Sequence, residues 1–170
     1  MGPYTPETTL DALVAFTRNH FAGVAIFGVE MTVIDLDSDA AALRSYPLLR
    51  WDPVDLYLDR MANTDRGNVD DRLNVYEFTI EYAPASAFTP DRGVTVPAIE
   101  RRMLTDGYGL LWALTKESNR AGGTTLGDAV RDIGYRGRLR FPRDPYAKDL
   151  DALTLSCKGQ IAVREHNQGR

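Results

Sequence analysis

Cysteine and histidine are scarce in this chain of 170 residues, which has one cysteine and two histidines. A single cysteine excludes an intrachain disulfide framework and any zinc site that needs several cysteines, and it fits a reducing compartment. Long apolar runs are also missing. The most apolar stretch, residues 21–34, is interrupted by Gly23, Gly28 and Glu30, whereas crossing a bilayer takes about 20 apolar residues. We therefore expect no membrane partner, and the N-terminus shows no secretory signal.

A surplus of positive charge is absent as well. The net charge is −4 and the pI is about 5.2, whereas dedicated nucleic-acid binders are usually basic. We expect no sequence-specific nucleic-acid binding. The charge is unevenly spread, because the first 60 residues carry nine acids and four bases, a net of −5, and the remainder is near +1. Such asymmetry favours an oligomer whose acidic and basic edges meet head to tail.

Motifs that would name a reaction are incomplete. The segment Asp35-Leu36-Asp37-Ser38-Asp39 resembles the start of a calcium loop, but Ala40 and Tyr46 occupy the positions that require Gly and Glu. Cys157 and His166 are nine residues apart, which is about 30 Å along an extended strand. Cys157 is better explained as a small buried apolar residue than as a nucleophile. We expect no metal, no cofactor and no enzymatic activity.

Hydrophobic periodicity predicts an alternation of helices and strands in one domain, residues 1–170. Helices are expected at 6–20 and 97–117, with a shorter one near 125–133. Strands are expected at 25–33, 73–83, 136–141 and 153–164, and residues 35–53 are expected to be irregular, with an apolar plug at 48–51. This order predicts an α+β fold, a mainly antiparallel β-sheet packed by an N-terminal helix and a longer central helix.

The central helix has one ambiguity. Its predicted core stripe is widened by Leu104 and Leu111, and its members are Ile99, Met103, Leu104, Leu110, Leu111 and Leu114. Gly107 and Gly109 each cost about 1 kcal/mol relative to alanine in a helix interior. Because Asp106 also falls near the stripe, the pattern leaves a kink or break open there.

Two charged groups are candidate contact sites. The first is an arginine row at the predicted strand 136–141 and just beyond it: Arg136, Arg138, Arg140 and Arg143. The second is the acidic turn with Asp35, Asp37 and Asp39. An arginine row can bind phosphates or an acidic partner, and a solvated strand face explains it about equally well.

The closing stretch DALTLSCKGQIAVRE alternates without losing phase, which predicts one strand of about twelve residues. Leu153, Leu155, Cys157, Ile161 and Val163 share one face with Gly159. So long a strand needs partners along its length, and a second subunit is one source of them.

The layout resembles that of small bacteriophage neck and tail-completion proteins, in particular tail terminators. The matching segments are PETTLDALVAFTRNHF, NVYEFTIEYA, PAIERRMLTDGYGLLWALTKES and the closing strand. This resemblance implies a structural virion protein at the head–tail neck, a ring-forming tail terminator or connector that assembles in the host cytoplasm. It further implies a homohexamer with tail-tube and head-side connector proteins as partners, and no cofactor. From charge alone, the arginine row and the acidic turn are then candidate subunit or tube contacts.

Two other functions stay open from the sequence. One is a small ligand-binding or enzymatic α+β domain with a pocket over the sheet, lined by Trp51, Tyr76, Tyr82 or Trp112. Aromatic residues at such positions are usually core. The other is a nucleic-acid-binding adaptor that uses the arginine row, which the acidic pI disfavours.

Overall fold

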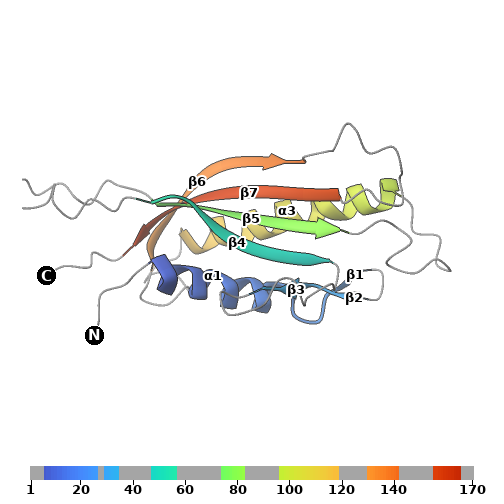
Figure 1. Ribbon diagram of the computed structural model, residues 1–170, viewed down its shortest axis with the longest axis horizontal. Coiled ribbons are helices and arrows are strands. Elements are labelled where there is room, and N and C mark those ends of the chain that lie inside the picture. The colour runs from blue at the N-terminus through green and yellow to red at the C-terminus, as the bar shows by residue number, and fades with distance from the viewer. Residues whose placement is uncertain are drawn as a thin grey trace, which may run out of the picture.

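The computed structural model describes residues 6–26, 29–34, 47–56, 74–82, 96–118, 130–141 and 155–165. In this part of the chain the helices are α1 (Pro6–Phe21) and α3 (Val96–Ser118). The strands are β1 (Ala25–Ile26), β2 (Val29–Glu30), β3 (Thr32–Val33), β4 (Leu48–Asp55), β5 (Asn74–Tyr82), β6 (Val130–Arg140) and β7 (Leu155–Glu165). Figure 1 shows β4 to β7 side by side along the molecule, with α1 beside the β4 edge.

Five of these strands form one sheet within the described residues, in the order β3-β4-β5-β7-β6. β3 pairs with β4 in parallel, and the other neighbours are antiparallel. β5 and β7 stay in register along their length, from Asn74 opposite Val163 to Tyr82 opposite Leu155. The fold is therefore α+β with a mainly antiparallel sheet, as the sequence predicted.

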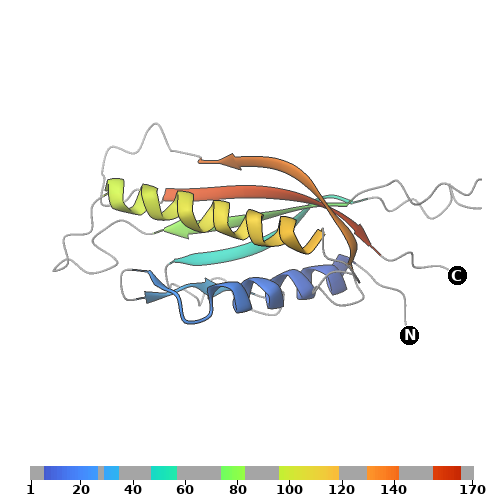
Figure 2. The ribbon, with the colours of Figure 1, turned by 180° about the vertical axis from the view of Figure 1, so that it is seen from behind.

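Both helices lie on the same face of the sheet and run in opposite directions (Figure 2). α3 packs against β5, β6 and β7, while α1 packs against β3 and β4. The core between the layers includes the fully buried residues Leu13, Leu49, Tyr76, Phe78, Ile80, Tyr82, Ile99, Leu110, Leu114 and Ile161. Neither of the described helices covers the opposite face of the sheet.

Helix α1 confirms the predicted N-terminal helix. Glu7 lies in its first turn, and Arg18 and His20 lie in its last turn. The negative charge of Glu7 and the positive charge of Arg18 each interact favourably with the helix dipole at their own end. Gly23 follows the helix with φ of 71°, a left-handed conformation that glycine adopts at low cost. α1 is joined to the sheet by Thr17, whose Oγ1 accepts a 2.9 Å hydrogen bond from Trp51 Nε1 on β4.

Two predictions for residues 25–53 are wrong. The expected continuous strand 25–33 is divided into β1, β2 and β3, and β1 turns back on β2 with Ala25 opposite Glu30. The expected irregular segment contains β4, in which Pro53 stands opposite Tyr76. Proline fits there because β3 pairs only at Leu48 and Leu49, so the missing N–H faces an unpaired edge. The predicted plug residues Leu49 and Trp51 are buried in the core.

The predicted short helix near 125–133 is also wrong where the structure describes it. Residues from Val130 onward belong to β6, with Ile133 opposite Val163 and Tyr135 opposite Ile161. A short helical pattern carries little weight against pairing with a long neighbouring strand, because tertiary context overrides weak propensity. Residues 125–129 lie outside the described part of the chain.

Helix α3 confirms the predicted central helix and continues through Asp106 without a break. The glycine beside it has a packing role. A Cβ atom at Gly107 would lie 2.6 Å from Cys157 Sγ, and one at Gly159 would lie 2.5 Å from Phe78 Cζ. Both glycines therefore let the helix and a neighbouring ring approach β7 closely.

Strand β7 confirms the predicted long closing strand, with eleven residues from Leu155 to Glu165. β5 lies on one side of it and β6 on the other. Its pairing partners are thus strands of the same chain, so the strand's length gives no reason to invoke a second subunit. Cys157, Ile161 and Val163 on its inner face are buried, as predicted.

Candidate functional site

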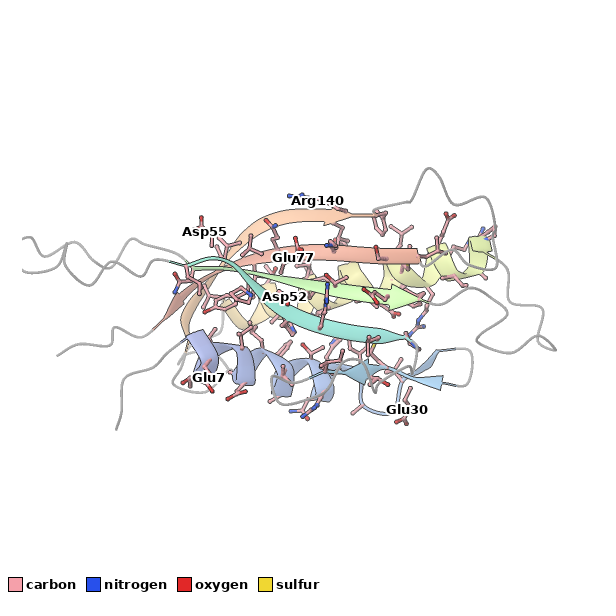
Figure 3. The ribbon with its side chains drawn as sticks, viewed as in Figure 1. Glu7, Glu30, Asp52, Asp55, Glu77 and Arg140 are labelled. Carbon is pink, nitrogen blue, oxygen red and sulfur yellow. The ribbon has the colours of Figure 1, made fainter. Side chains whose placement is uncertain are left out.

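Most of the predicted contact residues lie beyond what the structure describes. Arg140 is exposed at the end of β6, next to Lys158 of β7 (Figure 3). Arg136 and Arg138 lie on β6, where the backbone but not the side chains is described. Residues outside the described ranges are Arg143, Asp35, Asp37 and Asp39. Among the predicted site residues, the structure therefore gives an exposed side chain for Arg140, and the relation between the arginine row and the acidic turn stays a prediction.

The sheet face without a helix carries rows of charged side chains (Figure 3). Arg50, Thr79 and Lys158 are in register across three strands. Arg50 Nε lies 3.3 Å from Asp52 Oδ2, and Lys158 Nζ lies 3.6 Å from an oxygen of Glu77. The first pair is exposed and the second is partly buried; an exposed pair such as the first contributes about 0–1 kcal/mol. Among the side chains that the structure describes on this face, the bases Arg50, Arg140 and Lys158 are balanced by the acids Asp52, Glu77 and Glu81.

One polar atom on this face is unusual. Thr79 Oγ1 is buried and has no hydrogen-bond partner among the described residues, and the residue is only 2% exposed. Thr79 is flanked in register by Arg50 and Lys158 and along its own strand by Glu77 and Glu81. Because the acids balance the bases around it, the electrostatics favour neither an anion nor a cation there.

A buried polar cluster joins α3 to β5 under the helix layer. Tyr82 donates a 2.5 Å hydrogen bond to Asp106 Oδ2. Arg102, one turn earlier on α3, places Nε 2.9 Å from Asp106 Oδ1 and 3.1 Å from Oδ2. Asp106 is 3% exposed, so these donors replace its lost hydration and hold α3 in register on β5.

Burial dominates the titration of this cluster. It raises the pKa of Asp106, although the hydrogen bond from Tyr82 and the positive charge of Arg102 lower that pKa in part. It also raises the pKa of Tyr82, with the negative charge of Asp106 acting in the same direction. His20 on α1 has a lowered pKa because it is partly desolvated, and Asp106 opposes that effect. With its carboxylate closed off from solvent, the cluster acts as a structural tether for α3.

Cys157 shares this environment. Its pKa is raised to about 12, first by burial and second by the negative charge of Asp106. A thiol with so high a pKa is almost fully protonated near neutral pH, and the thiolate is the nucleophilic form. Cys157 thus has the properties of an inert core residue, and His166 lies outside the described ranges.

The outward side of α3 carries an apolar stripe that the sequence analysis did not identify. Leu104 is 52% exposed, Tyr108 63% and Trp112 53%. These positions repeat every four residues and form one ridge along the helix. The ammonium of Lys116 continues the ridge and lies 5.7 Å from the centroid of the Trp112 ring. We call Leu104, Tyr108 and Trp112 the α3 stripe.

Leu104 was predicted to widen the core stripe, and that prediction is wrong. The core side of α3 is formed by Ile99, Met103, Leu110 and Leu114, and Leu104 points to the other side. Tyr108 and Trp112 lie opposite the core positions Ile99 and Met103 around the helix. Leu104 lies close in phase to the buried Leu111, seven residues later, so periodicity alone does not separate Leu104 from the core.

A search with protein-family models finds no match to the chain. Curated proteins give no match either. In the described part of the chain, neither helix is long and apolar enough to cross a membrane, and no group of three or more His, Cys, Asp or Glu side chains is placed to hold a metal ion. Among the described residues, Leu104, Tyr108 and Trp112 form an exposed apolar patch along one helix.

Proposed function

We propose that this chain is a structural assembly protein of a bacteriophage virion, a ring-forming tail terminator or connector at the head–tail neck. The observation that supports an assembly role is the α3 stripe. The chain exposes about half of Leu104, Tyr108 and Trp112 in one continuous ridge, and such patches mark interaction surfaces more often than isolated exposed residues do. Tyrosine and tryptophan are also enriched among the residues that dominate binding energy.

The sheet edge is less suited to assembly than the helix layer. β6 forms one edge of the sheet in the described residues, and its register with β7 shifts between Val130 and Asp132 and between Tyr135 and Leu139. Arg140 adds an exposed charge at its end. Bulges and edge charges are devices that discourage pairing with another chain. Subunit contacts through the helix surface fit this pattern better.

The order of elements supports the viral part of the proposal. α1, β5, α3 and β7 occupy the four segments that resemble those of tail terminators. In this proposal the protein forms a homohexameric ring in the virion, after assembly in the host cytoplasm, and contacts tail-tube and head-side connector proteins without a cofactor. It acts by binding and not by catalysis.

The alternative of a ligand-binding or enzymatic domain gains no specific observation. Of the aromatic residues proposed to line its pocket, Trp51, Tyr76 and Tyr82 are buried in the core, whereas Trp112 is on the outward side of α3. They do not share one surface.

Native mass spectrometry and negative-stain electron microscopy of the purified chain test the proposal. A closed ring of six copies is expected. Trp112→Ala should shift the population to smaller species, while Phe141→Ala, which truncates a partly exposed aromatic residue outside α3, should leave the ring intact. Genes for capsid and tail proteins are expected beside the gene for this chain. A monomer at micromolar concentration, together with a gene neighbourhood of metabolic enzymes, would contradict the proposal.

A further inference from the structure

The α3 stripe is the middle of a longer row that carries opposite charges at its two ends. The row repeats every four residues and consists of Glu100, Leu104, Tyr108, Trp112 and Lys116. Lys116 is exposed and Glu100 is partly exposed. We call these five residues the α3 row. Figure 2 shows α3 in front of the sheet, and the exposed α3 stripe lies on the side of the helix that is turned away from the sheet.

We propose that the α3 row of one copy packs on the α3 row of a second copy of this chain, with the two helices antiparallel and related by a twofold axis at Tyr108. This inference rests on the proposed function as an assembly protein and names the surface that covers the α3 stripe.

The need for a matching apolar surface selects a second copy as the occupant. Among the described residues, the other large apolar side chains that are exposed are Val54 and Phe141. Val54 lies on β4 and Phe141 directly after β6, so each stands on a different element and neither belongs to a ridge. The described surface that can bury the α3 stripe against three large apolar side chains is therefore another α3 stripe. Residues that dominate binding also tend to pair with one another across an interface.

Charge favours the antiparallel direction. In an antiparallel pair, residues equally far before and after Tyr108 face each other, so Leu104 meets Trp112 of the second copy and Glu100 meets Lys116. Each Lys116 then has an acid of the other copy beside it. A parallel pair would place the two Lys116 side chains on each other without an acid from the row, and like charges placed together across an interface disfavour that arrangement.

One exposed base beside the row works against the contact. Arg101 precedes Tyr108 by seven residues, so in the antiparallel pair it also approaches Lys116 of the second copy and repels it, while Glu100 attracts it. Arg102 adds no further repulsion, because its Nε lies 2.9 Å from Asp106 Oδ1 in the same chain. The apolar side chains therefore hold the pair, and the charges at its ends set its direction.

The symmetry of the contact limits what it builds. A contact between two copies of the same surface stops at a pair. In a ring of six copies, three such pairs are then joined by a second contact elsewhere on the chain. Loss of the α3 contact should therefore divide the ring into smaller species.

Arg101→Glu in the full-length chain is the principal test. The change turns a repulsion of Lys116 into an attraction at both ends of the pair, so self-association should tighten by about 10-fold. It also makes the net charge of −4 more negative, which by itself weakens the association of two copies. A parallel pair predicts weaker association, because the new acid would then meet its own copy and the Glu100 of the second chain.

Glu100→Lys tests the opposite sign. It surrounds Lys116 of the second copy with bases, so association should weaken by about 10-fold although the net charge moves toward zero. Adding Lys116→Glu to the same chain should restore association. Residues 100 and 116 are about 24 Å apart along the helix, so this rescue reports a contact between copies. Glu100 also makes an interaction within its own chain, so Glu100→Gln is the milder variant, with an expected weakening of about 3-fold.

Arg50→Glu and Glu30→Lys are the matched controls. Both residues are exposed, and they lie on β4 and β2, so the two variants repeat the same charge changes away from α3 and should associate like the wild type. Sedimentation velocity over a dilution series gives the affinities, and circular dichroism shows that each variant is folded. In about 1 M salt, where the screening length is about 3 Å, the effects of Arg101→Glu and Glu100→Lys should largely disappear.

The outcomes separate the inference from the proposed function. Tighter association of Arg101→Glu together with weaker association of Glu100→Lys supports the antiparallel α3 pair. If the wild type assembles but Arg101→Glu associates equally well or more weakly, the pairing is wrong while the assembly role stands. If the wild type is monomeric throughout the dilution series, the inference and the self-assembly on which it rests both fail.

Discussion

Replacing Tyr82 by Phe tests the reasoning about the buried cluster, because it removes one hydroxyl and little volume. That hydroxyl donates a 2.5 Å hydrogen bond to Asp106, whose other described donor is Arg102. A hydrogen bond to a charged group is worth about 1.5–3 kcal/mol. For a chain of this size the melting temperature should fall by about 3–12 °C. Urea and thermal unfolding followed by circular dichroism measure the loss at pH 7.

The pH dependence makes this prediction sharper. Burial raises the pKa of Asp106 in the folded protein, so the folded state holds a proton at a pH where the unfolded side chain, with a pKa of about 3.9, has released it. The contribution of Asp106 to the free energy of unfolding therefore falls as pH rises from about 4 through the folded pKa. Since the Tyr82 hydroxyl favours the carboxylate, Tyr82→Phe raises that pKa further.

The stability difference between wild type and Tyr82→Phe should therefore be larger at pH 7 than at pH 4, where Asp106 gains a proton and the lost bond is a neutral one worth about 1 kcal/mol. The lowered pKa of His20 affects both proteins and largely cancels in the difference. Thr105→Ser, at an exposed position of α3 outside the α3 stripe, serves as the control and should change stability by less than about 0.5 kcal/mol. A loss equal to that of the control at pH 7, or one that grows toward pH 4, would refute the role given to this bond.

Three further predictions follow from single atoms of the structure. Thr79→Val should stabilise the fold by up to about 1–2 kcal/mol, because it removes a buried hydroxyl without a partner among the described residues. Thr17→Val should destabilise the fold, because it removes the acceptor of the hydrogen bond from Trp51. Urea titrations in which both variants change the free energy of unfolding in the same direction would contradict this. Gly159→Ala should cost about 1–3 kcal/mol, since the new Cβ would lie 2.5 Å from the Phe78 ring, and an unchanged unfolding midpoint would show that the ring moves freely. Cys157, with a pKa raised to about 12, should resist thiol reagents at pH 8 in the folded protein and react fully in urea; rapid labelling of the folded chain would show that the side chain is accessible.

The predictable elements are those whose pattern agrees with their final environment. β5 alternates Tyr76, Phe78, Ile80 and Tyr82 toward the core, and all four are fully buried. β7 keeps its phase through Gly159 because Phe78 from the neighbouring strand occupies the space over that glycine. The two main helices follow the same logic, since each packs an apolar side against the sheet.

The missed elements depend on contacts that distant parts of the chain supply. β4 contains Pro53, which a sheet tolerates only beside an unpaired edge, and the position of that edge is not a local property. β6 takes its conformation from β7. Helix α3 continues through Asp106, where Tyr82, 24 residues earlier in the chain, supplies a hydrogen-bond donor under the helix. In these segments the local sequence pattern is a poor guide, because the conformation is set by pairing with distant strands.

The candidate site was missed for a different reason. Periodicity assigns an apolar residue beside the core stripe of a helix to the core, and Leu104 was therefore predicted to be buried together with Met103 and Leu111. Only the burial of the core positions Met103 and Leu110 separates them from the exposed ridge that Leu104 forms with Tyr108 and Trp112. The predicted charged contacts remain predictions, apart from the observed exposure of Arg140.

The central claim is that the chain assembles through the α3 stripe, and sedimentation velocity of wild type and Trp112→Ala at one micromolar-range concentration tests it most directly. The wild type should sediment as one discrete oligomer of ring size, and Trp112→Ala should sediment mainly as a folded monomer or small species. A wild type that sediments as a monomer, or a variant that sediments like the wild type, would contradict the claim.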